Sequence, residues 1–224
     1  MLKRLVLLSS LALLIAPIAF ASDRSDDISR THRAAQVFRE IMQAPDGGIP
    51  HDLLRKAKCI AIIPGDTKFA FIFGGNYGRG VASCRTAHGW SAPIFLAMEG
   101  GSVGYQIGGS STDLVLLFMN DRALHSLLND KFKLGADASV AAGPVGRQAT
   151  ADTDLALNAE ILSYSRSKGV FAGVSLSGSV VKADTSGDEA MYGPNIDRHN
   201  ILDGSVRDPD SSRYLEHELR RDAD

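Results

Sequence analysis

The sequence predicts an α+β fold in which a mostly antiparallel, curved or barrel-like sheet carries an amphipathic N-terminal helix and short packing helices. Three observations support this class. A helical pattern precedes the first apolar segment, short extended segments separated by glycines follow it, and the repeated strand–helix alternation of parallel sheets is missing. A length of 224 residues, of which 44% are apolar, suits one globular domain.

The N-terminus has the pattern of a secretory signal peptide. Lys3 and Arg4 form a basic segment, residues 5–18 are apolar, and Ala19-Phe20-Ala21 is an A-x-A cleavage site. The apolar run is shorter than the roughly 20 residues that a membrane span needs. We therefore expect cleavage after Ala21 and a periplasmic or secreted protein.

Residues 25–42 are predicted to form the first helix, which Pro45 ends. Its apolar face consists of Ile28, Thr31, Ala34, Ala35, Phe38, Ile41 and Met42. This face could pack on the sheet or lie in a membrane interface, and the pattern favours the sheet. Residues 51–58 are a candidate for a short second helix.

From Lys58 onward, extended segments dominate the pattern. Residues 112–119 are apolar on both faces and predict a central buried strand. Asn120 or Asp121 is expected to cap a short helix that runs through Leu128. Residues 169–184 alternate between apolar and small polar side chains and predict one long strand.

Gly100-Gly101-Ser102-Val103-Gly104 matches the G-x-S-x-G pattern of a nucleophilic serine. That motif needs a strand, a sharp turn and then a helix. No helical stripe follows Ser102 until Asn120, so we interpret the motif as a glycine-rich turn between strands.

Other catalytic and binding chemistry is weakly represented. The sequence contains no H-E-x-x-H, C-x-x-C or P-loop motif, and its six histidines are scattered. We therefore expect no metal, no cofactor and no enzymatic activity. The net charge of −2 offers no overall basic field for nucleic acid. Loss of residues 1–21 leaves 22 basic and 26 acidic residues, a net charge of −4.

The two cysteines, Cys59 and Cys84, lie in separate strand-like segments. An oxidising compartment would permit a disulfide between them, whereas two buried thiols are the alternative. The sequence leaves both possibilities open.

Several long blocks occur in an order that resembles one family. They include "AKCIAIIP", "FIFGGNYGRGVASCR", "GGSVGYQIGGSSTDLVLLFMN", "KFKLGADASVAAGPVGR" and "AEILSYSRSKGVFAGVSLSGSVV". These blocks resemble the SYLF-domain family, whose bacterial members are lipid-binding proteins and whose eukaryotic members bind phosphoinositides and actin filaments. The resemblance spans about residues 34–202. Together with the N-terminal pattern and the polar composition of the last residues, it predicts a signal peptide over residues 1–21, a SYLF-like domain over 22–207 and a polar tail over 208–224, which we expect to be partly disordered.

The resemblance implies binding of anionic phospholipid at a periplasmic membrane face, with the protein peripheral to that membrane. In eukaryotic relatives, lipid binding is attributed to an amphipathic N-terminal helix with basic residues. The resemblance therefore implies that basic and apolar residues of the predicted helix over residues 25–42 contact lipid. The candidate lipid-binding residues are Arg30, Arg33, Phe38, Arg39, Lys131, Lys133, Arg147 and Lys168. A structural or protein-interaction module of the envelope, with an unknown protein partner, is the alternative. Lysines such as Lys131 and Lys133 could also serve only to block edge pairing of the sheet.

Overall fold

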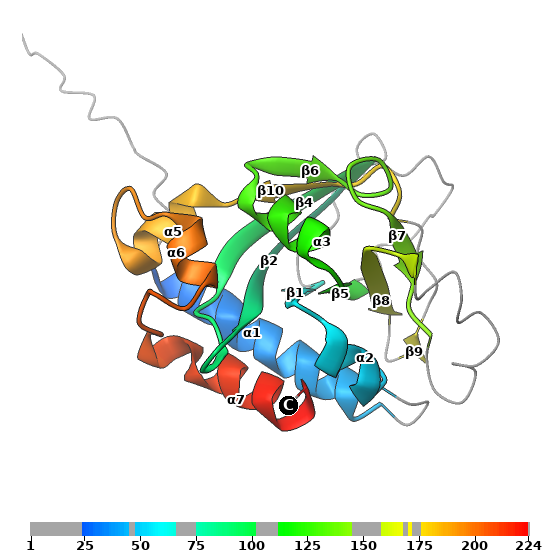
Figure 1. Ribbon diagram of the computed structural model, residues 1–224, viewed down its shortest axis with the longest axis horizontal. Helices are drawn as coiled ribbons and strands as arrows, with labels where there is room; N and C mark the ends of the chain where they lie inside the picture. The colour runs from blue at the N-terminus through cyan, green and yellow to red at the C-terminus, as the bar shows by residue number, and fades with distance from the viewer. Residues whose placement is uncertain are drawn as a thin grey trace, which may run out of the picture.

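A strongly curved sheet with helices on both faces forms the body of the protein (Figure 1). This computed structural model describes residues 24–44, 48–65, 75–101, 112–144, 158–167, 170–171 and 176–223. The main path of the sheet has the order β6-β10-β4-β2-β1-β5-β8-β7, while β3 pairs with β2 and β9 pairs with β8. Only the β7–β8 pair is parallel among these described pairings. The predicted α+β class with a mostly antiparallel, curved sheet is confirmed.

The elements agree in large part with the sequence pattern. The strands are β1 (Cys59–Ile63), β2 (Gly75–Thr86), β3 (Gly89–Trp90), β4 (Ile94–Gly101), β5 (Thr112–Phe118), β6 (Lys131–Lys133), β7 (Val140–Ala142), β8 (Ile161–Ser167), β9 (Val170–Phe171) and β10 (Val180–Ala183). The helices are α1 (Arg24–Met42), α2 (His51–Lys56), α3 (Asp121–Leu128), α5 (Thr185–Tyr192), α6 (Arg198–Leu202), the 3₁₀ turn η2 (Asp210–Ser212) and α7 (Arg213–Ala223). As predicted, the Asn120 side chain caps α3 by accepting a hydrogen bond from the Ala123 N–H.

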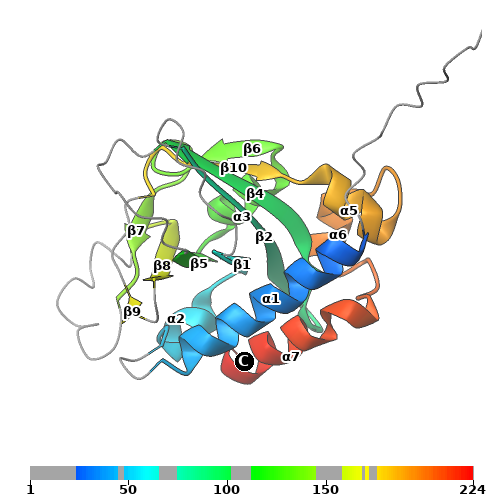
Figure 2. The ribbon, with the colours of Figure 1, turned by 180° about the vertical axis from the view of Figure 1, so that it is seen from behind.

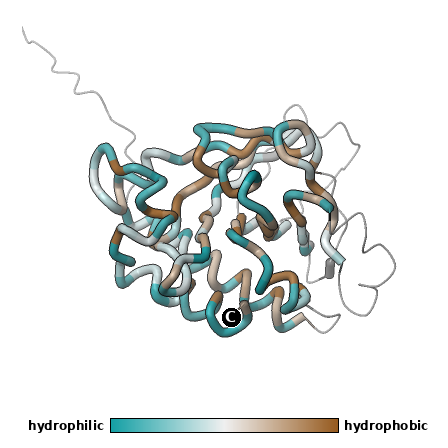
Figure 3. Tube along the Cα trace, in the orientation of Figure 1, coloured by the Kyte–Doolittle hydropathy of each residue, from teal (hydrophilic) through white to brown (hydrophobic). Residues whose placement is uncertain are grey.

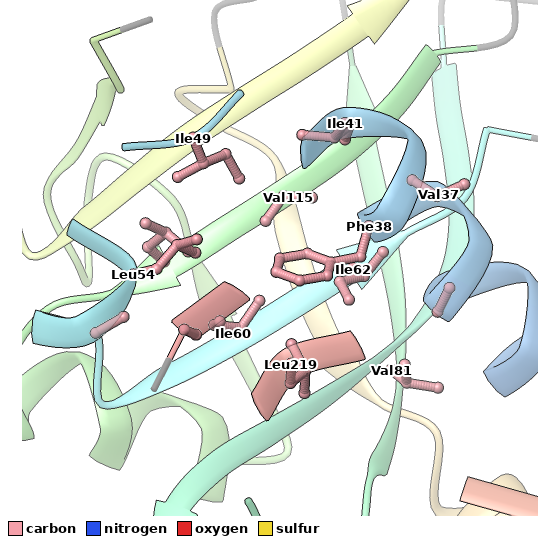
Figure 4. Packing of buried hydrophobic residues seen from close by; sticks show 14 of the residues in the cluster. Val37, Phe38, Ile41, Ile49, Leu54, Ile60, Ile62, Val81, Val115 and Leu219 are labelled. Carbon is pink, nitrogen blue, oxygen red and sulfur yellow. The ribbon is translucent and has the colours of Figure 1, made fainter. Parts of the chain in front are cut away.

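Helix α1 packs its apolar stripe on the sheet. Figure 2 shows α1 crossing one face of the sheet with α7 beside it. Phe38 and Ile41 are fully buried, and Figure 4 shows the Phe38 ring among Ile60, Ile62 and Val115 of the sheet. The structure therefore decides between the two uses of the stripe that the sequence left open: it forms core.

The other face of the sheet has its own apolar cluster. Helices α3 and α6 cover this face and contribute Leu127 and Ile201, while Phe132 enters the cluster from β6. The central strands β1 and β5 therefore have buried side chains on both faces. This double burial explains why their sequences are continuously apolar instead of alternating.

A disulfide joins Cys59 and Cys84, which are direct partners on the antiparallel strands β1 and β2. Their Cα atoms lie 3.9 Å apart. Of the two states that the sequence allowed, the structure shows the bonded one.

Two elements differ from prediction. Residues 169–184 do not form one long strand, because the chain turns at Ser177-Gly178 and Gly178 has a φ of 94°. The two halves then pair with different partners: β9 with β8, and β10 with β4 and β6.

The second difference concerns residues 208–224, which were expected to be a partly disordered tail. Most of this segment is the helix α7, whose Leu215, Leu219 and Ala223 are buried against the α1 side of the sheet. Figure 3 shows that hydrophilic and hydrophobic residues alternate along this helix. Most of the polar residues that suggested a tail lie on the outer side of the helix, whereas Glu218 is buried and pairs with Arg221. No helix within the described ranges has the length and apolar character to cross a membrane.

Candidate functional site

An exposed part of the sheet face continues beyond the area that α1 covers. The strands β2, β4, β10 and β6 place eight residues there in two rows, because directly opposite residues on antiparallel strands share a face. The first row is Tyr77, Glu99, Val180 and Lys133, and the second is Arg79, Ala97, Lys182 and Lys131. We call these residues the two-row surface. The next row along β2 and β4, Val81 and Phe95, already belongs to the buried core.

The two-row surface combines positive charge with modest apolar area. Lys131 and Lys133 are exposed at the edge strand β6, and Phe132 between them is buried. Tyr77 is 43% exposed and is the only large apolar side chain classed as exposed in the described part of the chain. The lysine at position 182 contacts Glu99, with 2.5 Å between Nζ and Oε2, and both side chains are about half exposed.

The ammonium groups of Lys131 and Lys133 make no ion pair within the described ranges. The backbone N–H of Lys133 donates to the Asp137 carboxylate, which occupies a donor on the β6 segment. The structural interpretation of the lysines as protection of a sheet edge therefore has support from the geometry. It leaves both charges available to solvent.

A largely buried ion network adjoins the second row of the two-row surface through Arg79, which belongs to both. Asp184 accepts hydrogen bonds from Arg30 Nη1 at 2.8 Å and from Arg79 Nη2 at 2.7 Å. Arg30 also pairs with Asp27 at 2.7 Å, and its guanidinium stacks over the Phe95 ring. The network joins α1, β2 and the start of α5, and its two arginines balance its two carboxylates.

The pKa values in this network follow from that pairing. Burial works to raise the pKa of Asp184, but hydrogen bonds from Arg79, Arg30 and Ser186 outweigh it and hold that pKa well below its usual range. For Arg79, burial works to lower the pKa, and the hydrogen bond and charge of Asp184 raise it above its ordinary value. Arg79 is thus a fully charged residue that is committed to Asp184.

A second buried pair fixes α5 and α6 to β4. Asp188 accepts a hydrogen bond from the Phe95 N–H at 2.8 Å and lies 3.2 Å from Arg198 Nε. Burial raises the pKa of Asp188 to about 7, although Arg198 and the Phe95 N–H work against this shift. Burial likewise lowers the pKa of Arg198. We interpret this pair as structural, because it lies in the interior.

The predicted lipid-binding residues are not gathered at one place. The side chain of Arg30 is 2% exposed, and Phe38 is fully buried. Neither residue can therefore contact a membrane in this conformation. Arg33 is exposed on α1, and Arg39 lies over the ring of Tyr214 from α7. Figure 2 shows α1 on the lower part of the sheet, away from the β6 strand that carries Lys131 and Lys133. Arg147 and Lys168, like Ser102, lie outside the described residues.

Sequence reasoning missed Tyr77, Glu99 and Lys182 as members of a site. They come from segments that are separated by dozens of residues, and only the order β6-β10-β4-β2 brings them together. The one available signal was the alternation that places Val180 and Lys182 on the same side of a strand. No group of histidine, cysteine and acidic side chains suited to a metal ion occurs in the described ranges.

Comparisons with known proteins bear on the family of this chain. The family described as "Ysc84: Las17-binding protein actin regulator" matches residues 99–221, more than half of the chain. LAS seventeen-binding protein 3 of Saccharomyces cerevisiae is 36% identical over 190 residues, which cover 81% of this chain and 41% of the relative. The human SH3 domain-containing YSC84-like protein 1 is 32% identical over 194 residues, which cover 84% of this chain and 56% of the relative.

The chain therefore spans about half the length of the curated relatives that it matches. The match ends at residue 221 and so covers most of the helix α7, which lies in the segment predicted to be a polar tail. The predicted resemblance is confirmed: the chain belongs to the Ysc84 (SYLF) family.

Proposed function

We propose that the protein is an exported, non-enzymatic binding domain that contacts anionic phospholipid at a periplasmic membrane face through the two-row surface. One observation carries the proposal. Lys131, Lys133 and Lys182 lie on one solvent-accessible part of the sheet, where Glu99 is the only carboxylate of the two rows. A local excess of positive charge of this kind suits lipid headgroup phosphates.

The strength of this contact follows from local charge and not from the whole molecule. With a net charge of −4 for residues 22–224, long-range attraction to an anionic membrane is absent. Each basic residue near such a surface contributes about 1 kcal/mol, within a Debye length. Three lysines therefore give weak, salt-sensitive association, to which Tyr77 adds an amphipathic ring of the kind that sits at membrane interfaces.

The proposal revises the part played by α1. Phe38 is a core residue and Arg30 is held between two carboxylates, so the proposal assigns no lipid contact to either. Arg33 and Arg39 belong to α1 and not to the strands that form the two-row surface, and Arg39 contacts the ring of Tyr214 from α7.

Export is part of the proposal and has two supports. The first 21 residues have the pattern of a cleaved signal peptide. The disulfide between Cys59 and Cys84 is of a kind that persists in oxidising compartments such as the periplasm.

A protein partner is the second candidate, and the names of relatives favour it. The family description and the yeast relative both refer to Las17 binding. The same lysines could then contact an acidic protein surface in the envelope. Absence of vesicle binding would favour this candidate over the lipid one.

Flotation of the mature protein with liposomes tests the proposal. We expect binding to vesicles that contain phosphatidylglycerol, weak binding to pure phosphatidylcholine, and loss of binding as salt increases. The double variant Lys131→Gln/Lys133→Gln should weaken binding by roughly tenfold or more at low salt and flatten the salt dependence.

Lys56→Gln/Lys58→Gln is the matched control for this test. Both are exposed lysines at the end of α2 and just before β1, outside the two-row surface, so their loss removes the same two charges from another place. Equal binding of neutral and anionic vesicles, or equal effects of the two double variants, would contradict the proposal.

A further inference from the structure

Two lysines of the two-row surface face each other directly. Lys131 on β6 and Lys182 on β10 are register partners of an antiparallel pair, so their side chains leave the sheet on the same face. Directly opposite residues have Cβ atoms roughly 5 Å apart, and like charges in such positions are destabilising. An anion between the two ammonium groups would remove this repulsion.

Glu99 supplies only part of the missing negative charge. Its carboxylate lies diagonally across from Lys182 on β4 and contacts the Lys182 ammonium, whereas no described carboxylate pairs with Lys131. The contact is about half exposed on both sides, so it is weakly held and can exchange with a ligand. The trio of Lys131, Lys182 and Glu99 keeps one uncompensated positive charge.

The other charged residues near this trio are already committed or lie further away. Arg79 belongs to the same row but makes hydrogen bonds to Asp184 through two nitrogens. Lys133 stands opposite Val180 and therefore lies one row away from the Lys131–Lys182 pair. Asp137 accepts from the Lys133 backbone N–H.

We propose that Lys131 and Lys182 together bind one phosphate group that carries two negative charges, and that Glu99 occupies Lys182 when no phosphate is present. Two opposed ammonium groups match a dianion in charge, and phosphate monoesters are largely dianionic above a pH of about 6. Binding exchanges the Glu99 contact of Lys182 for a phosphate oxygen. The lipid form of this inference rests on the proposed function, whereas binding of free phosphate does not.

The first arm uses inorganic phosphate and the mature protein in solution. Titration at pH 7.5 is followed by the NMR signals of the lysine side chains, against sodium chloride of equal ionic strength. Saturable shifts at Lys131 and Lys182 are expected. Lys131→Gln and Lys182→Gln should each weaken phosphate binding by about tenfold, Lys133→Gln by about two- to threefold, and Lys56→Gln not at all.

The role of Glu99 is tested in the same titration. Glu99→Gln leaves Lys182 without its internal partner and should strengthen phosphate binding about three- to fivefold. That gain should disappear in the double variant Glu99→Gln/Lys182→Gln if Glu99 acts through Lys182. Thermal unfolding of each variant checks that the fold is retained, and Lys182→Arg should restore binding in part.

The second arm separates a lipid headgroup from free phosphate. Vesicles with phosphatidic acid, a phosphate monoester, are compared with phosphatidylglycerol vesicles of equal surface charge, and stronger binding to phosphatidic acid that depends on Lys182 is expected. Phosphate shifts without any vesicle binding would support the site and overturn the membrane proposal. Equal binding to phosphatidic acid and phosphatidylglycerol vesicles, together with equal phosphate affinity of Lys182→Gln and Lys56→Gln, would overturn this inference. The membrane proposal would then remain intact.

Discussion

At the scale of single residues, the position of a charged side chain in the fold determines its role. Arg30 looks like a basic residue on an amphipathic helix, yet it is buried between Asp27 and Asp184. Burial of one charge without a partner is costly, and here the two carboxylates that pair with Arg30 offset that cost. A residue that suggested membrane contact instead fixes α1 to the start of α5.

Asp188 provides a prediction about pH at this scale. Its pKa in the folded protein is about 7, above the ordinary value of 3.8, so the folded state holds a proton that the unfolded state has lost between these values. The contribution of Asp188 to the unfolding free energy is fully present below pH 3.8. It decreases as the pH rises to about 7, by a total of at most about 4 kcal/mol. Relative to Asp188→Asn, the natural protein should therefore lose unfolding free energy between pH 4 and pH 8.

Urea unfolding of both proteins across this range measures the difference. Asp208, whose pKa burial raises to about 6, contributes in the same direction, but it is present in both proteins and cancels. Parallel stability curves for the two proteins would mean that Asp188 stays ionised throughout and would contradict the prediction.

At the scale of elements, α7 shows how a strongly charged segment can still complete a core. Leu215, Leu219 and Ala223 repeat every four residues and are buried, while the charged residues between them face solvent or form pairs within the helix. A stripe of three residues is too narrow to stand out in a polar sequence. It becomes recognisable only beside α1, with which α7 packs.

Leu219→Ala tests whether α7 is an integral element. Leu219 is 1% exposed in the first core cluster, so the truncation should lower the unfolding free energy by about 2–4 kcal/mol. Arg213→Ala, at a largely exposed position of the same helix, should change it by less than about 1 kcal/mol. Thermal or urea unfolding distinguishes the two, and equal stability of both variants would show that the segment behaves as a tail.

At the scale of the whole molecule, the disulfide makes the stability of the fold depend on an oxidising compartment. It joins the two central strands β1 and β2 across a separation of 25 residues. Closing a loop of this length in the unfolded chain stabilises the folded state by roughly 3 kcal/mol in the loop-entropy description. A reducing compartment would not supply this contribution.

Mass spectrometry of the protein from a periplasmic fraction tests both export and bonding. We expect a mature chain that begins at Ser22, with Cys59 and Cys84 protected from alkylation until reduction. The double variant Cys59→Ala/Cys84→Ala should have an unfolding free energy that is lower by roughly 3 kcal/mol. An uncleaved chain, or two thiols that react without reduction, would argue against an exported and oxidised protein.

The sequence by itself determined the class of fold and most of the individual elements. Periodicity located α1 and the buried strand β5, and Asn120 marked the start of α3, because each of these signals is local to a few turns or strand residues. The family could also be recognised from ordered blocks.

Only the tertiary structure decided which residues share a surface. Tyr77, Glu99 and Lys182 meet Lys131 because β10 lies between β6 and β4, and strand order is a long-range property that local patterns do not encode. The same holds for Arg30 and Phe38, since an amphipathic stripe can be buried in a membrane interface as well as on a sheet. The apolar face that the folded sheet offered to α1 made the difference, and it left the lysine-bearing end of that sheet open to solvent.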